Sequence, residues 1–204
     1  MHSVQILLKK SAVAVFVALA VFLTAPVYSQ EEPDPNSPVP IFVSIAGEPR
    51  ALAFQTVKSR RSELRLRQQT VFAPDNKVVL LVANIDLLKG EDANAFRVYA
   101  QDQKGRTYRF PVLDLRPSDY PGVYQLTIRL RDEIGYWPKP EANADLLMYI
   151  TWRGLASNPL KFGYGSIGGT FGNEKSLRPM PLAEAIKLRG LTSAQKTDLP
   201  ALAE

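Results

Sequence analysis

The feature that most constrains this chain is a series of short stretches within residues 41–165 in which apolar and polar side chains alternate. In residues 95–101, for example, Phe96, Val98 and Ala100 fall on one side of an extended chain, and the residues between them fall on the other. The same alternation recurs in 64–67, 108–112, 124–130, 146–152 and 160–164. Each stretch is typical of a β-strand with one buried face and one solvent-exposed face.

Other stretches agree with this pattern. Residues 78–82 are apolar on both sides, as expected for a strand in the centre of a sandwich. Turn-forming residues separate the strands at 102–105 and 116–122, and Pro111 places its strand at an edge or a bulge. We therefore predict an antiparallel β-sandwich domain over residues 41–165, with about seven or eight short strands.

The first 40 residues have a different composition. Two lysines precede an apolar run at 12–23, and small residues follow at Val27 and Ser29, which predicts a secretory signal peptide at 1–29. Because the run is shorter than the roughly 20 residues that span a bilayer, we expect cleavage, with a retained anchor as the alternative. Residues 30–40 are rich in proline and acids and are predicted to be an extended linker. We expect the protein in the periplasm, at the cell surface or outside the cell, with no membrane span after cleavage.

Residues 166–204 form a predicted connector and tail. The first part is rich in glycine, and 181–189 is expected to be a short helix that begins near its proline and stops at Gly190. One face of this helix carries Leu182, Ala185 and Ile186. A helix this short is marginal by itself, so it either docks on the sandwich or frays.

Composition excludes several classes of function. The chain has no cysteine, and its one histidine, His2, lies in the predicted signal peptide. The mature protein then lacks the side chains for Ser-His-Asp or Cys-His catalysis and for zinc sites built from imidazole or thiolate. With 25 basic and 20 acidic residues the chain is only mildly basic, unlike a nucleic-acid-binding protein. We predict a non-enzymatic protein with no metal, cofactor or nucleic-acid partner, and its oligomeric state stays open.

Residues 82–88 with Gly90, the hairpin end at 105–108 and the stretch 150–158 carry a family resemblance. In 150–158 a strand with Trp152 on its buried side is followed by a glycine turn and a Ser-Asn pair before the last strand. These stretches resemble the immunoglobulin-like modules of the IPT/TIG type in secreted bacterial surface proteins. The resemblance implies that the predicted sandwich is immunoglobulin-like. With the helix expected at 181–189, the predicted fold is all-β, an antiparallel immunoglobulin-like β-sandwich with a short, partly helical C-terminal tail. It also implies a binding, adhesion or spacer role, without a catalytic residue.

Two groups of side chains are candidates for ligand binding. Tyr136 and Trp137 lie in a loop rich in proline and glycine, where Trp137 either caps the core or presents its ring to a sugar or a partner protein. Seven arginines, with Arg129 and Arg131 as candidate ligand contacts, fall on the polar side of the predicted strands; the seven are Arg65, Arg67, Arg97, Arg109, Arg129, Arg131 and Arg153. If several share one sheet face they can hold an acidic polysaccharide. The alternative is a solvated face whose arginines pair with acids.

Two further motifs favour structural roles. The glycines of 163–168 match a dinucleotide-binding pattern, but no helix is predicted to open at the third glycine, so we interpret them as a flexible exit from the sandwich. Asp86, Glu91 and Asp92 lack the spacing of an EF-hand calcium loop, so no calcium site is predicted there.

Four acidic residues near strand ends offer a remaining route to catalysis, because a glycoside hydrolase needs two carboxyl groups facing each other across a cleft. We expect solvated turn residues instead; the four are Asp114, Asp119, Asp132 and Glu133. The sequence therefore predicts an exported, non-enzymatic binding, adhesion or spacer module whose partner is an envelope protein or a polysaccharide. The alternatives are a small carbohydrate-binding module, which would use the loop aromatics and an arginine-rich sheet face, and a carboxylate-based hydrolase.

Overall fold

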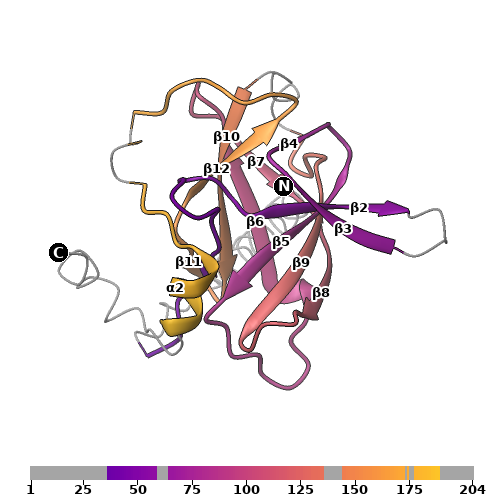
Figure 1. The fold of residues 1–204 in the computed structure, drawn as a ribbon, viewed down its shortest axis with the longest axis vertical. Helices are drawn as coiled ribbons and strands as arrows, with labels where there is room; N and C mark the ends of the chain where they lie inside the picture. The colour runs from indigo at the N-terminus through magenta and orange to yellow at the C-terminus, as the bar shows by residue number, and fades with distance from the viewer. Residues whose placement is uncertain (1–35, 59–63, 136–143, 173, 175–176, 189–204) are drawn as a thin grey trace, which may run out of the picture. The chain divides into compact units, whose positions relative to one another are not determined.

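Figure 1 shows the computed structural model of the chain, which describes residues 36–58, 64–135, 144–172, 174 and 177–188. The predicted signal peptide and most of the predicted linker lie outside the described residues. None of the helices within these ranges is long and apolar enough to cross a membrane.

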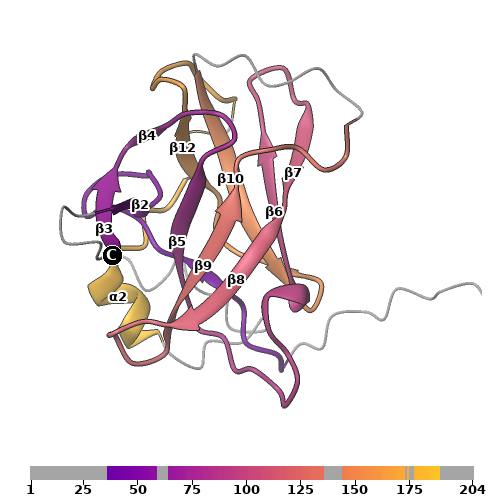
Figure 2. The same cartoon turned by 90° about the vertical axis from the view of Figure 1, so that its right-hand side faces the viewer.

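The strands form two sheets (Figures 1 and 2). The first sheet contains β1 (Ile41–Phe42), β2 (Ala53–Lys58), β3 (Leu64–Gln69), β5 (Lys77–Ala83), β8 (Val112–Pro117) and β9 (Val123–Arg129). Its order is β3-β2-β5-β9-β8, and β1 also pairs with β5. The second sheet contains β4 (Val71–Phe72), β6 (Phe96–Gln101), β7 (Thr107–Phe110), β10 (Ala144–Trp152), β11 (Leu155–Ala156) and β12 (Leu160–Tyr164). Its order is β4-β12-β10-β6-β7, and β11 pairs with β10. Two short helices are described, η1 (Ala93–Ala95) and α2 (Leu182–Lys187).

This arrangement confirms the predicted all-β sandwich, but strand pairing departs from the prediction at one place. β4 and β12 run parallel, whereas the other strand pairs are antiparallel. The chain leaves the first sheet at the end of β3 and enters the second sheet at β4 after the single residue Thr70. The chain bends at Thr70, and β4 then lies along β12 in the same direction.

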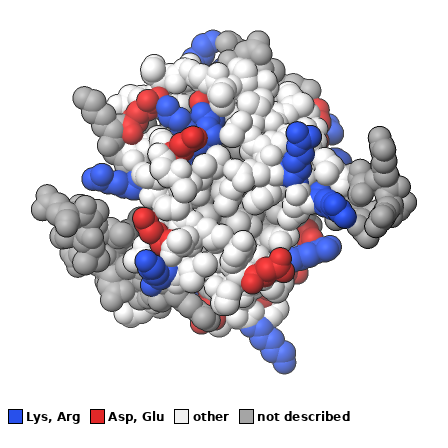
Figure 3. Space-filling view, in the orientation of Figure 1, with Lys and Arg blue, Asp and Glu red and all other residues white. Residues whose placement is uncertain are grey.

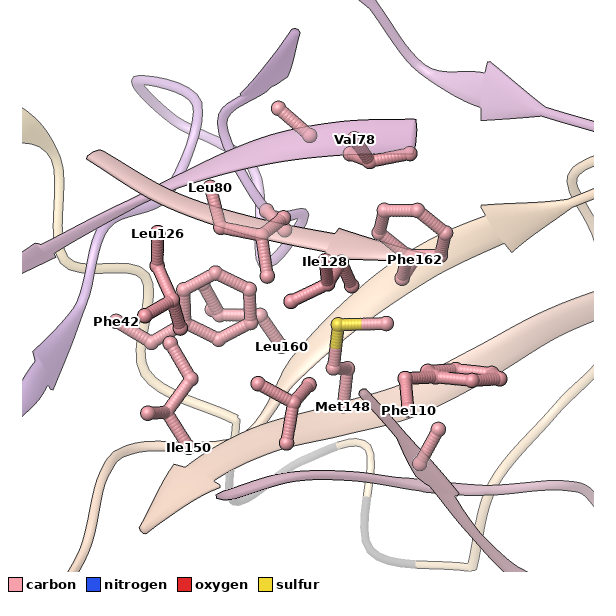
Figure 4. Packing of buried hydrophobic residues seen from close by; sticks show 14 of the residues in the cluster. Phe42, Val78, Leu80, Phe110, Leu126, Ile128, Met148, Ile150, Leu160 and Phe162 are labelled. Atoms are coloured by element: carbon pink, nitrogen blue, oxygen red, sulfur yellow. The ribbon is translucent and has the colours of Figure 1, made fainter. Parts of the chain in front are cut away.

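The facing sides of the two sheets form one hydrophobic core (Figure 4). Val78, Leu80 and Ile128 of the first sheet are fully buried, and they share a cluster with Met148 and Phe162 of the second sheet. In β6 the burial alternates as predicted, with its even-numbered residues buried and its odd-numbered residues half-buried or exposed. The period of two in the sequence is thus the period of burial.

The apolar residues of β5 are buried on both sides, as predicted, because the outer face of the first sheet is also covered. Leu81 and Ala83 belong to a second, smaller cluster that includes Val43 beside β1 and Ala185 of α2. The central strand therefore faces the core on one side and the C-terminal helix on the other.

The C-terminal helix is docked on this outer face (Figure 1). It begins at Leu182, one residue after the proline predicted to start it, and Leu182, Ala185 and Ile186 pack in the second cluster. The preceding residues are also held, since Ser44 donates a backbone hydrogen bond to the carbonyl of Met180 (2.9 Å). Of the two outcomes expected for a marginal helix, docking is the one observed for the described residues.

Packing also begins before the predicted start of the sandwich. Val39 is 3% exposed, and its carbonyl accepts a hydrogen bond from the side-chain amide of the buried Asn84 (2.8 Å). The end of the proline-rich segment is therefore part of the folded domain. The sequence did not predict this earlier start, because a single apolar residue in a polar stretch gives no periodic pattern.

Candidate functional site

The structure describes half of the predicted binding site. Tyr136 and Trp137 lie outside the described residues. Arg129 ends β9 opposite Lys77 of β5, and Arg131 follows in a turn; both are exposed. Neither forms an ion pair with a described residue. The structure thus shows two exposed arginine side chains shortly before Tyr136 and Trp137 in the chain. That a ligand binds them stays a prediction.

The seven patterned arginines do not share one sheet face. Arg65 and Arg67 lie on β3 of the first sheet, whereas Arg97 and Arg109 lie on β6 and β7 of the second sheet. Figure 3 agrees for the face it shows, where basic and acidic side chains are interspersed around a largely uncharged centre. Alternation in a sequence predicts the side of a strand to which a residue points, but it does not predict to which of the two sheets the strand belongs.

Arg153 has a structural role. With Gly154 it forms the turn between β10 and β11, and both residues have positive φ (49° and 75°). Its guanidinium donates hydrogen bonds to both carboxylate oxygens of Glu91 (2.8 and 2.6 Å) and lies 4.1 Å from the ring centroid of Trp152. The hydrogen bonds from Arg153 hold the pKa of Glu91 below its ordinary value. Trp152 is fully buried, which confirms the prediction of a core residue.

A group of aromatic and cationic side chains lies on the outer face of the second sheet. Tyr99 of β6 and Tyr149 of β10 are directly opposite in the ladder, and their rings stack with centroids 5.4 Å apart at an angle of 22°. Arg109 of β7 is opposite Tyr99, and Arg97 is opposite Thr151. We call this group, Tyr99, Tyr149, Arg97, Arg109 and Thr151, the tyrosine face.

A pocket of about 280 Å³ adjoins the tyrosine face, since Arg97 and Arg109 line both. It lies where β7 ends and the chain crosses to β8, which leaves the start of β6 without a neighbour on that side. Asn94 of η1 and Glu133 also line it. The pocket therefore combines two guanidinium groups with polar groups at the edge of the sheet.

The two arginines of the pocket differ in their partners. Arg109 pairs with Glu133 (3.1 Å), and both side chains are more than a third exposed. Arg97 donates hydrogen bonds to the carbonyls of Asn94 (2.5 Å) and Phe96 (2.8 Å) and forms no ion pair with any residue that the structure describes. The positive charge of Arg97 is thus oriented but not neutralised, so it can attract an anionic group.

The tyrosine hydroxyls are available for hydrogen bonding. Neither the hydroxyl of Tyr99 nor that of Tyr149 is bonded within the described part of the chain. Burial, with a smaller effect of Tyr99, raises the pKa of Tyr149, so its hydroxyl remains protonated and able to donate at neutral pH. Because each ring covers one face of the other, at most one face of each ring, with its edge and hydroxyl, is left for a ligand.

Three of the four acids considered for hydrolysis, Asp114, Asp132 and Glu133, have other partners among the described residues. Asp132 accepts hydrogen bonds from the backbone N–H groups of Arg109 (2.9 Å) and Gly135 (2.8 Å), and Asp114 pairs with the arginine two residues later (2.6 Å). Glu133 is the only carboxylate among the described residues that line the pocket. The described lining of the pocket therefore contains no pair of facing carboxylates of the kind that glycoside hydrolysis requires.

The acids considered for calcium are likewise engaged. Glu91 binds Arg153, and Asp92 caps η1 by accepting a hydrogen bond from the backbone of Asn94 (2.9 Å). Within the described ranges no three histidine or acidic side chains are grouped closely enough to hold a metal ion.

The glycine motif differs from the expected flexible exit. Gly163 lies inside β12 and is buried, and a Cβ there would collide with the carbonyl oxygen of Thr70, just before β4. Gly168 exchanges hydrogen bonds with Asp145, accepting from its backbone N–H (2.9 Å) and donating to its carboxylate (3.2 Å). Gly163 thus allows close backbone approach, and Gly168 adopts a positive φ (136°) that favours glycine. The spacing of the glycines alone did not distinguish these roles from mobility.

Sequence reasoning missed the tyrosine face. The alternation in β6 does place Arg97 and Tyr99 on the polar side, and that of β10 places Tyr149 there too. Only the register between β6 and β10, two strands almost 50 residues apart in the sequence, brings the tyrosines together.

Comparison of the chain with protein-family models, with curated proteins and with solved structures gives no match.

Proposed function

We propose that this protein is a non-catalytic binding module that holds a partner protein on the tyrosine face. The observation that carries the proposal is the stacked pair of Tyr99 and Tyr149, with both hydroxyls unbonded to described residues, next to the unneutralised Arg97. Tyrosine and arginine are enriched among residues that dominate protein interfaces, because they combine a large contact area with polar ends. The partner is expected to place an acidic group at Arg97.

We also propose that the sandwich is immunoglobulin-like. The order β2-β5-β9-β8 in the first sheet corresponds to strands A-B-E-D of that fold, and β7-β6-β10-β12 in the second corresponds to C′-C-F-G. This order supports the fold expected from the resemblance to IPT/TIG-type modules, which are binding or spacer modules. Export to the cell envelope or beyond remains part of the proposal, and it rests on the signal-peptide pattern of residues 1–29.

A protein partner is favoured over a carbohydrate for this face. Sugar rings stack on open aromatic faces, and the mutual stacking of Tyr99 and Tyr149 leaves at most one face of each ring for such a contact, whereas tyrosine beside arginine is typical of protein interfaces. A carbohydrate-binding module remains the second candidate, since Tyr136 and Trp137 lie outside the described residues and Arg129 and Arg131 are exposed. A pure spacer would leave the tyrosine face without a partner.

The test compares Tyr99→Ala/Tyr149→Ala with Tyr120→Ala, an exposed tyrosine between β8 and β9. Each purified protein is cross-linked to an envelope fraction prepared from the organism that naturally produces the protein. The captured proteins are quantified by mass spectrometry. We expect the captured amount of one protein, or of a few, to be at least about tenfold lower with the double variant. The reason is that loss of central interface tyrosines typically weakens the free energy of binding by about 2 kcal/mol or more. Capture by Tyr120→Ala should match the unmodified protein.

Two outcomes would count against this function. Equal capture by the double variant and the unmodified protein, with both folded by circular dichroism, would contradict binding at the tyrosine face. Binding of a polyuronic acid such as polygalacturonate that is lost with Arg129→Ala/Arg131→Ala but kept in the double tyrosine variant would favour the carbohydrate-binding alternative.

A further inference from the structure

The two strand orders of the described residues end in four strands, β3, β8, β4 and β7, and three of these are protected against pairing with another strand. β4 is only two residues long. β7 is capped by the loop after β9, which supplies a hydrogen bond to each backbone group of Arg109. β8 follows Pro111, has a register irregularity near its start and ends in Pro117, in agreement with the edge or bulge predicted from Pro111. Such features are the usual means by which sheets prevent edge-to-edge association.

The fourth edge, β3, has none of these protections. Its six residues pair with β2 on one side, and among the described residues no strand lies on the other side. Of its backbone groups, those of residues 66–69 form no hydrogen bond beyond the β2 ladder in the described part of the chain. Every second residue of this stretch directs its backbone N–H and C=O away from β2, so β3 offers these donors and acceptors to an added strand.

β2 and β3 also extend beyond the other strands of the first sheet, as Figure 1 shows on the right-hand side. All six residues of β2 pair with β3, but only residues 53–55 pair with β5. The side chains from Arg65 to Gln68 are exposed on both faces of β3, and Leu66 is 43% exposed. An incoming strand can thus reach this edge without displacing any described element.

The side chains of β3 select what can pair there. Arg65 and Arg67 lie on the same face, and residues opposite each other in neighbouring strands have Cβ atoms about 4.5–5.5 Å apart. Opposite charges at such positions stabilise a pair of strands and like charges destabilise it. A second copy of β3 paired antiparallel about Leu66 would place Arg65 against Arg67, so this register of self-pairing is disfavoured.

We propose that β3 is a docking edge for an extended partner segment with Asp or Glu at alternate positions, which adds to the first sheet as a seventh strand. Backbone hydrogen bonds along residues 66–69 supply the attachment, and the acidic side chains facing Arg65 and Arg67 supply the selectivity. This site is independent of the tyrosine face, which lies on the second sheet.

The test uses two labelled synthetic peptides, Thr-Glu-Val-Glu-Val-Glu-Thr and the same sequence with lysine in place of glutamate, in fluorescence anisotropy with the full chain. We expect the glutamate peptide to bind at least about tenfold more tightly than the lysine peptide. Arg65→Glu/Arg67→Glu should reverse the preference. Arg116→Glu, on the opposite edge strand β8, is the matched control and should leave the preference unchanged.

A second readout locates the peptide. Amide hydrogen exchange should slow in β3 when the glutamate peptide is added, and it should not change in β8. Failure of the glutamate peptide to bind at millimolar concentration would overturn the proposal. So would a preference that survives the double charge reversal in a variant shown to be folded by circular dichroism, or protection confined to strands other than β3.

Discussion

Replacement of Arg50 by methionine tests how much a buried ion pair stabilises this sandwich. Arg50 donates two hydrogen bonds to Asp145 (2.6 and 3.0 Å), and the side chains of Arg50 and Asp145 are 14% and 3% exposed. Methionine keeps the apolar stem of Arg50 but leaves the carboxylate of Asp145 with one hydrogen-bond donor among the described residues, the N–H of Gly168 (3.2 Å). Removing one partner of a buried pair costs about 3–5 kcal/mol, so we expect the free energy of unfolding to fall by about 3 kcal/mol.

Arg116→Met is the matched control, because Arg116 pairs with Asp114 at an equally short 2.6 Å but the side chains are 74% and 40% exposed. Exposed pairs contribute about 0–1 kcal/mol, so this variant should lose little. Urea denaturation at neutral pH gives both values from the transition midpoint and slope. In the double variant Arg50→Met/Asp145→Asn the unpaired charge is gone, and part of the lost stability should return. A loss for Arg50→Met within about 0.5 kcal/mol of that for Arg116→Met would refute the reasoning.

Two further predictions concern Glu91 and Gly163. Because hydrogen bonds from Arg153 lower the pKa of Glu91 from its ordinary 4.5, the carboxylate stabilises the fold above that pH, and this contribution is lost as the pH falls through the lowered value. Thermal melts of the unmodified protein and Glu91→Gln should thus differ most at neutral pH and converge in acid; a gap that widens in acid would contradict this sign. Gly163→Ala should lower the free energy of unfolding by at least about 2 kcal/mol, because its Cβ meets the backbone of Thr70, whereas Gly172→Ala has open space and should be nearly neutral in the same denaturation assay. Equal stability of the two alanine variants would show that the β4 segment shifts at no cost.

Local patterns in the sequence determined the strands and the side chains that they bury. The period of two in residues 96–101 is set by the geometry of a single extended strand, and it correctly placed Phe96 and Val98 in the core. The apolar run around Leu80 identified the central strand, and Trp152 was recognised as core from its side of the strand alone. These properties depend on residues close in the chain, so they could be predicted without knowing which strands lie side by side.

Tertiary structure decided which strands became neighbours, and with them the candidate site. Tyr99 and Tyr149 stack, and Asn158 bonds the backbone of Phe42 across 116 residues of sequence, only because the fold sets long-range register. The division of the arginines between two sheets and the open edge at β3 likewise follow from strand order. Register and order arise from packing and pairing between distant segments, and a period-two pattern is the same whichever strand lies beside it.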